Sequence, residues 1–258
     1  MTTKFIFRIL TTSLIVLYGL SDVVAQSAKK VYWQTGAGIT LQSFFGDLSV
    51  HDFNPLKKIS NESDLGFYVQ FTGNFTPLLS TKAQFIHGKM RGSNPESGYY
   101  FNAGFNELTI IPRLNINSLF FHQQSSRFQA FIVGGVGLIN FRSTKYNIAD
   151  GSLESSVGYN EKGKKQHNPV YSFVFPLGIE ATYAINARWG IEAGYTMRLH
   201  NTDNIDAHIG STNINDRYSV THLGIIYTLN GSPGRNIEAL DCSPGDGVSR
   251  IKKKGRLF

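Results

Sequence analysis

The sequence predicts an all-β fold: an eight-stranded antiparallel up-and-down β-barrel that crosses a membrane. Three observations lead to this prediction. Apolar residues recur at every second position in eight segments, the connections between these segments alternate in length, and an apolar leader precedes them. Because successive side chains of an extended strand point to opposite faces, a period of two gives each segment one apolar and one polar face.

The clearest of the eight segments runs from Trp189 to His200. Its odd positions are all apolar, and its even positions are small, polar or charged. The other seven follow the same rule with different regularity. We predict strands at Val31 to Phe45, Leu65 to Phe75, Thr81 to Met90, about Tyr100 to Asn115, Phe128 to Arg142, Tyr171 to Tyr183 and Tyr218 to Leu229.

Two of these segments do not alternate simply. In the fourth, Phe101 and Phe105 share one parity whereas Leu108 and Ile110 share the other, which predicts a bulge or an early strand start near Asn106. The fifth has apolar residues on both parities around its cluster of glycines. Its alternation therefore does not indicate which face is which.

The connections between the segments predict the direction of the barrel. Four are long and polar, two are tight, and residues 116–126 form an intermediate link. The long ones are residues 47–64, 92–98, 144–168 and 201–217, and the tight ones are residues 77–80 and 185–187. Short periplasmic turns and long outer loops are typical of outer-membrane barrels, and an even strand number places both termini in the periplasm.

The two ends of the chain predict its domain organisation. Lys4 and Arg8 precede an apolar run that ends at Val24-Ala25, a pattern that resembles a cleavable signal peptide spanning residues 1–25. The barrel then occupies residues 26–229, and residues 230–258 form a flexible basic tail on the periplasmic side. The single cysteine, Cys242, excludes an internal disulfide.

A soluble barrel or a β-sandwich would show the same alternation with the apolar face turned inward. Two features favour lipid instead: aromatic residues near strand ends, as in interfacial girdles, and Gly, Gln, Thr, Glu and Arg on the opposite face. The aromatic residues that we expect to face lipid or its interface are Trp33, Phe67, Phe71, Phe173, Phe175, Tyr183, Trp189, Tyr195 and Tyr227.

If the apolar rows face lipid, five charged side chains point into the lumen: Glu107, Arg113, Glu180, Glu192 and Arg198. The interior of an eight-stranded barrel is just wide enough for side chains to fill it, and charges buried there must pair. We therefore expect Glu180 or Glu192 to pair with Arg113 or Arg198. Such a plug argues against an open porin, and a narrow ion or small-solute channel is the alternative.

No catalytic, cofactor or metal site is predicted. The histidines lack the H-x-x-H and H-E-x-x-H spacings, the serines form no nucleophile elbow, and the acids at residues 203–206 lack the spacing of an EF-hand loop. The net charge of +7 would suit nucleic acid, but a secretory leader makes that partner improbable. In the tail, Lys252, Lys253 and Lys254 are candidates to contact a polyanion, a cell-wall component or a periplasmic secretion component, and a solvated tail without a partner is the alternative.

The order of several motifs resembles the outer-membrane β-barrel proteins of Bacteroidota, whose barrels are similar to that of OmpA. These motifs are F-I-V-G-G-V-G at residues 131–137, G-I-E-A-G-Y at 190–195, N-T-D-N-I-D at 201–206, and N-D-R-Y at 215–218 leading into L-G-I-I-Y-T-L at 223–229. The alternating ending of the last segment also resembles the signal that the outer-membrane assembly machinery reads during insertion. The resemblance implies an integral membrane protein of the outer membrane.

One branch of this group, the PorG-like proteins, accompanies the type IX secretion machinery. The N-E-L motif at residues 106–108 and the T-D-N-I-D loop at residues 202–206 resemble that branch. The resemblance implies a scaffold rather than a catalyst. The residues therefore lead us to expect a non-enzymatic barrel that supports the envelope or scaffolds an assembly, with a secretion accessory of the PorG type as an alternative.

Overall fold

The computed structural model describes residues 31–46, 48–50, 57–58, 62–120, 127–159, 170–200, 205–207 and 216–230. The predicted signal peptide, residues 1–25, and the tail with Lys252, Lys253 and Lys254 lie outside the described residues. Within the described part of the chain, no helix has the length and apolar character needed to cross a bilayer.

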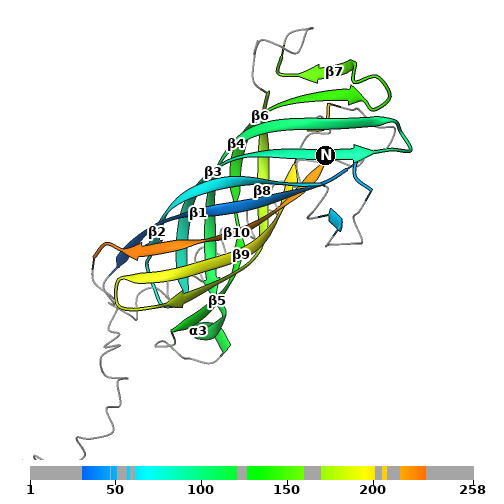
Figure 1. Cartoon of the computed structure of the whole chain (residues 1–258). Helices are drawn as coiled ribbons and strands as arrows, with labels where there is room; N and C mark the ends of the chain where they lie inside the picture. Colours follow the sequence, from blue (N-terminus) through cyan, green and yellow to red (C-terminus); the bar gives the residue numbers. More distant parts are fainter. Residues whose placement is uncertain are drawn as a thin grey trace, which may run out of the picture.

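The described chain is almost entirely β-structure (Figure 1). A short helix, α3 (Ile116–Phe120), follows the fourth strand. The strands are β1 (Tyr32–Phe45), β2 (Ser63–Asn74), β3 (Leu79–Asn94), β4 (Tyr99–Asn115), β5 (Phe128–Gly134), β6 (Val136–Asn147), β7 (Leu153–Val157), β8 (Val170–Ala184), β9 (Trp189–His200) and β10 (Arg217–Thr228).

These strands close into an antiparallel ring. β1 pairs with β2 on one side and with β10 on the other, and the ladder continues from β2 through β3 to β4 and from β10 through β9 to β8. β5 and β6 both lie between β4 and β8, so they complete the ring together. Closure leaves no free edge in the ring. The predicted eight-stranded antiparallel barrel is confirmed.

β5 and β6 are two parts of one wall strand, interrupted at Gly135. The register against β4 is the same on both sides of the break, with Ile132 opposite Leu114 and Val136 opposite Ile110. The Gly135 N–H donates to the Pro176 carbonyl at 2.9 Å. Because a proline has no backbone N–H, Pro176 cannot donate the second hydrogen bond of the ladder to Gly135. A Cβ at Gly135 would also lie 2.3 Å from the Ile110 carbonyl oxygen, so no side chain fits there. The fifth segment thus keeps a single phase.

β4 contains no bulge, and the prediction of one near Asn106 is wrong. β4 pairs with β3 residue for residue, from Leu114 opposite Leu79 to Tyr99 opposite Asn94. The backbone alternation is continuous, but the chemistry of its two faces is exchanged along the strand. Phe101 and Phe105 are buried inside the barrel, whereas Leu108 is exposed on its outer surface.

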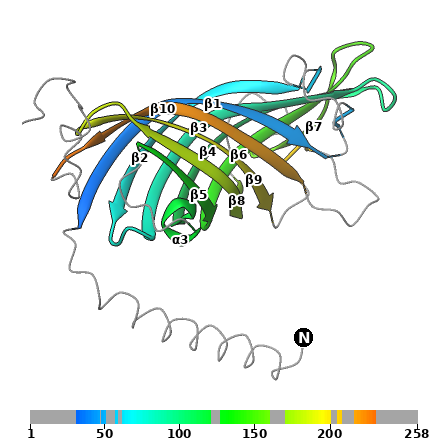
Figure 2. The same ribbon diagram turned by 90° about the horizontal axis from the view of Figure 1, so that it is seen from below.

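The two ends of the barrel differ in their connections. The turns β2–β3 and β8–β9 and helix α3 lie at one end, the turn end, together with the start of β1 and the finish of β10. The other end, the loop end, carries the connections β1–β2, β3–β4, β6–β8 and β9–β10. Figures 1 and 2 show the strands tilted around a common interior, with the hairpin of β6 and β7 beyond the ring at the end away from α3.

Two of the predicted long loops contain regular structure. β3 continues to Asn94, so only a short turn that contains Gly98 in the left-handed region, with φ of 78°, joins it to β4. Part of the connection 144–168 forms β7, which pairs with β6. In the turn between them, the backbone N–H and the hydroxyl of Ser152 donate to Asp150 and hold the pKa of its carboxyl below the ordinary value.

The outer surface of the ring is apolar. Large apolar residues from every wall strand except β3 are exposed there, among them Ile39, Leu65, Leu108, Ile132, Phe173, Ile179, Ile191 and Leu223, and the outward Phe85 of β3 is half-buried. Seven of the nine predicted aromatic residues are also at least 44% exposed on this surface, namely Phe67, Phe71, Phe173, Phe175, Tyr183, Trp189 and Tyr195. Trp33 and Tyr227 share the outward parity and are half-buried, because Trp33 stacks on Phe71 at 5.2 Å and Tyr227 packs on Trp189 at 4.8 Å. A soluble barrel would require the opposite orientation.

Candidate functional site

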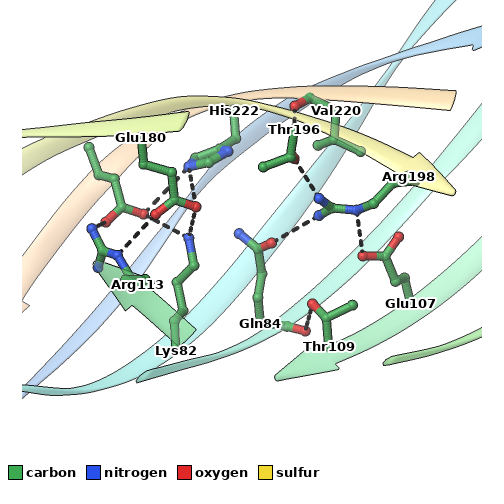
Figure 3. Close-up of polar contacts among 11 residues, drawn as sticks. Lys82, Gln84, Glu107, Thr109, Arg113, Glu180, Thr196, Arg198, Val220 and His222 are labelled. Carbon is green, nitrogen blue, oxygen red and sulfur yellow. Dashed lines mark hydrogen bonds and ion pairs between the residues drawn. The ribbon is translucent and has the colours of Figure 1, made fainter. Parts of the chain in front are cut away.

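The lumen is the part of the barrel where charged side chains gather. All five predicted lumen residues are buried, and they fall into two separate clusters. We call the first the acid-pair cluster, which comprises Lys82, Arg113, Glu180, Glu192 and His222. The second is the Arg198 cluster, which comprises Gln84, Glu107, Thr196, Arg198 and Tyr218. Figure 3 labels most members of the two clusters, which come from β3, β4, β8, β9 and β10.

In the acid-pair cluster, two cations share two carboxylates. The guanidinium of Arg113 lies 3.1 Å from Glu180 through Nε and 3.1 Å from Glu192 through Nη2. The Lys82 ammonium donates to Glu180 Oε1 and lies 3.4 Å from Glu192 Oε1. Two positive charges thus balance two negative charges, which meets the requirement that buried charges pair.

His222 completes this cluster from β10. Its Nε2 lies 3.5 Å from Glu192 Oε1 and 3.9 Å from Glu180 Oε1. Its ring packs edge-on against Tyr68 at 5.2 Å. A Cβ at Gly194 would lie 2.5 Å from the imidazole Cε1, so the glycine provides the space that the ring occupies.

The acid-pair cluster also has the donor set of a cation site, because one atom each from Glu180, Glu192 and His222 lie within 4.8 Å of one another. However, Lys82 and Arg113 already contact these carboxylates. A metal ion at these carboxylates would have to displace the Lys82 ammonium and would lie close to the Arg113 guanidinium. The positive charges of both groups would repel it. The arrangement therefore fits an internal ion-pair network better than a metal site.

The Arg198 cluster uses every nitrogen of one guanidinium. Arg198 donates through Nε to Glu107 at 2.9 Å, through Nη2 to Gln84 at 3.2 Å, and through Nη1 to the Thr196 hydroxyl. The second oxygen of Glu107 accepts a hydrogen bond from the Tyr218 hydroxyl. Arg113, and not Arg198, is thus the partner of Glu180 and Glu192.

The sequence did not single out Lys82 or His222 as members of the network. Both occupy the inward parity of their strands, the parity that carries Gln84 on β3 and Gly224 on β10. The third segment is irregular because the residues on either side of Lys82, Thr81 and Ala83, are not strongly apolar. Once the inward positions of that strand are known, alternation places Lys82 inside the barrel.

Above the Arg198 cluster, the lumen is closed by an apolar plug. The plug consists of Phe44, Leu48, Tyr68, Ile86, Met90, Phe101, Ala103, Phe105, Ile139, Phe141, Ile205, Tyr218 and Val220, all buried. Phe44 and Phe101 meet edge-to-face at 4.6 Å across it. Leu48 and Ile205 come from the loop-end connections β1–β2 and β9–β10 rather than from strands. The loops therefore supply part of the seal.

Hydrogen bonds tie these connections to the barrel. The Ser49 hydroxyl and the Val50 N–H donate to the Glu62 carboxylate at 2.7 and 2.9 Å, and Lys58 forms a buried ion pair with Glu62 at 3.1 Å. The Ile205 N–H donates to Asp216 at 2.8 Å. Both loop-end connections that enter the plug are thus fixed by buried acids.

No protein-family model and no curated protein sequence matches the chain. Among solved structures, Ail of Yersinia pestis in complex with the heparin analogue sucrose octasulfate shares 12% identity at a TM-score of 0.44, covering 78% of this chain and 99% of that one. OprG of Pseudomonas aeruginosa shares 13% identity at a TM-score of 0.38, covering 80% of this chain and 99% of that one. A major outer membrane protein of Thermus thermophilus shares 10% identity at a TM-score of 0.40, covering 76% of this chain and 99% of that one. Likeness at this level carries no argument about function, so the conclusions below follow from this chain's own strand pairing and side chains.

Proposed function

We propose that this chain is a non-enzymatic integral barrel of the outer membrane of a Gram-negative bacterium, with a structural or scaffolding role and a closed lumen. The observation that carries the proposal is the orientation of the two faces. Apolar side chains cover the outside of the ring and paired charges fill its inside.

The apolar exterior supports a lipid environment. Burying one Leu, Ile or Phe side chain is favourable by about 1.5–3 kcal/mol relative to leaving it in water, and the wall strands other than β3 expose large apolar residues of this kind. Alternation of apolar outward and polar inward residues on tilted antiparallel strands is the pattern of outer-membrane barrels. In such barrels the short turns face the periplasm, so the start of β1 and the finish of β10, which lie at the turn end, would be on that side.

The filled lumen supports a scaffold rather than a channel or an enzyme. Ions would have to pass both charge clusters and then the apolar plug, whose members are at most 3% exposed. A general acid or base must reach a substrate. Glu107, Glu180 and Glu192 are each engaged by an arginine inside a closed interior.

Two measurements on the purified full chain test this function. A closed membrane barrel should migrate differently in detergent gels before and after boiling, and its reconstitution into planar bilayers should give no steady conductance. Identical migration together with recovery from the soluble periplasm would contradict the barrel. Steady ion flow that lumen substitutions abolish would instead establish the channel.

The PorG-like role in type IX secretion stays a prediction that rests on sequence resemblance, and so does a contact of Lys252, Lys253 and Lys254 with a periplasmic partner. Deletion of the gene should then abolish secretion of cargo that carries the C-terminal signal of that system. Crosslinking of the tail in the native envelope would identify what it touches. Unaltered secretion would leave the envelope scaffold as the function.

A further inference from the structure

The outer wall formed by β3, β4 and β6 changes its chemistry within one row of residues. The row Phe85, Leu108 and Leu138 is apolar and pairs across the three strands. The next row toward the loop end is His87, Asn106 and Asn140, and no further outward position of these three strands is aliphatic up to their ends. Such an edge marks where the wall leaves the hydrocarbon of a bilayer.

Beyond this edge lies a cationic row with a gap at its centre. Lys89 and Arg142 flank Gly104 in register. Neighbouring strands are about 4.8 Å apart, so the two cations start about 10 Å from each other. A Cβ added at Gly104 would meet nothing within 4 Å, so the space between the cations is open.

The charges of this wall are not neutralised by the barrel itself. Among the described residues, neither Lys89 nor Arg142 forms an ion pair or a side-chain hydrogen bond, and Arg91 follows one row further out. The outward positions of the eight wall strands carry no Asp or Glu in the described chain. Glu96 and Asp150 lie in the turns beyond the strands, and Glu154 lies on β7, which pairs with β6 at Tyr146 and Lys145 beyond the ring.

A stacked aromatic pair ends the same wall. Tyr100 and Tyr146 pair across β4 and β6, and their rings lie 5.3 Å apart at 20°. One row between them and the cations carries Asn102. Stacked phenol rings offer an apolar face and hydroxyl groups together, which suits the flat face and the hydroxyls of a sugar ring.

From these observations we propose that this wall binds a phosphorylated glycolipid of the outer leaflet, with a phosphate between Lys89 and Arg142 over Gly104 and saccharide along Asn102 toward the two tyrosines. Arginine and lysine both bind phosphate through charge-assisted hydrogen bonds. The inference rests on the proposed function, because it places the loop end at the outer surface.

The height of the wall favours a glycolipid over a phospholipid. One row rises about 5 Å above the bilayer when a strand with 3.4 Å per residue is tilted by about 40°. The cationic row therefore lies about 10 Å above the last apolar row and the tyrosine pair about 20 Å above it. The headgroup layer of a phospholipid leaflet is only about 5–8 Å thick, so snorkelling side chains of the cationic row reach it but the tyrosines do not.

The test compares ligands on the purified full chain in zwitterionic nanodiscs. The ligands are bisphosphorylated lipopolysaccharide of the rough type, its enzymatically dephosphorylated form, phosphatidylglycerol and inorganic phosphate. We expect the first to bind about tenfold or more tighter than each of the others, since charge-assisted bonds are lost with the phosphates. Equal binding of the dephosphorylated form, or of phosphatidylglycerol, overturns the proposal.

Variants assign the binding to this wall. Lys89→Gln combined with Arg142→Gln should weaken glycolipid binding about tenfold or more, because both charge-assisted hydrogen bonds to the phosphate are lost. Gly104→Leu should weaken it without changing any charge, because the side chain fills the open space. Arg217→Gln is the matched control, since Arg217 is exposed on β10 at the opposite side of the ring.

Retention of binding by the first two variants, or an equal loss in the control, overturns the proposed site. Heat-shifted gel migration is recorded for every variant. A wild-type chain without that shift contradicts the proposed membrane barrel itself, whereas a shifted chain without glycolipid preference contradicts only this inference.

Discussion

The two halves of β4 use the same backbone alternation for opposite purposes. Toward the turn end, Leu108 and Ile110 are exposed outside while Glu107 and Arg113 are buried inside. Toward the loop end, Asn102 is exposed outside while Phe101 and Phe105 are buried inside. The strand does not shift its register between the halves. What changes is the solvent around the wall, from lipid to water.

This comparison also separates two ways of filling a barrel. The interior near the turn end contains ion pairs, which must all be satisfied because an unpaired charge there has no water to replace its partner. The interior near the loop end is the apolar plug, which is stabilised by the burial of apolar surface area and by close packing. The two interiors should therefore respond differently to substitution.

The largest effect is expected in the acid-pair cluster. Arg113→Met removes the arginine that both Glu180 and Glu192 contact, and breaking a buried pair in this way costs about 3–5 kcal/mol. The free energy of unfolding, measured with urea in phospholipid vesicles, should fall by this amount. Arg217→Gln removes an exposed arginine and should change it by less than about 0.5 kcal/mol. A similar small change in both variants would mean that the buried pairs do not stabilise the barrel.

The plug should respond next. Phe101→Ala removes a ring that packs on Phe44 and leaves a cavity, so we expect a loss of about 3 kcal/mol in the same unfolding measurement. Phe101→Leu keeps most of the volume and should lose about half as much or less. If Ala and Leu destabilise equally, packing is not what holds this half together.

Alternation alone predicted the wall strands of the ring and the five inward charged residues, because both follow from the geometry of one extended segment, but it did not predict β7. It did not predict the exchange of faces on β4, since we assumed one solvent along the whole strand and interpreted the change of parity near Asn106 as a bulge or an early strand start. The phase of the fifth segment was hidden for a different reason: Phe131 and Val133 are buried beside Ile111 inside the barrel while Ile132 is exposed outside, so both faces of the segment are apolar. The partners of each charge depend on the stagger of strands across the ring, as between Glu107 on β4 and Arg198 on β9, and no single segment contains that information.

The edge between the two environments can be located by charge insertion along the outer face of β4. Ile110→Lys places an ammonium in the apolar band and should destabilise by about 2–3 kcal/mol, whereas a charge near the interface costs about 0–1 kcal/mol. Asn102→Lys lies beyond the edge and should have no measurable effect on the same urea curves. Equal losses at the two positions would contradict an edge between Asn106 and Leu108.

The smallest effect is expected at the turn end of the exterior. Trp33 stacks on Phe71 at 5.2 Å and meets Phe75 edge-on at 6.1 Å, so it belongs to the aromatic group that would lie at the periplasmic interface. Trp33→Leu keeps an apolar surface and removes the aromatic pairs, which are worth about 0.5–1.5 kcal/mol beyond the buried area. We expect the free energy of unfolding in vesicles to fall by about 1 kcal/mol. The fluorescence of the remaining tryptophan, Trp189, should stay blue-shifted, at the same wavelength before and after the substitution. A loss as large as that of Arg113→Met would show that the exterior, and not the ion pairs of the lumen, dominates the stability of this half.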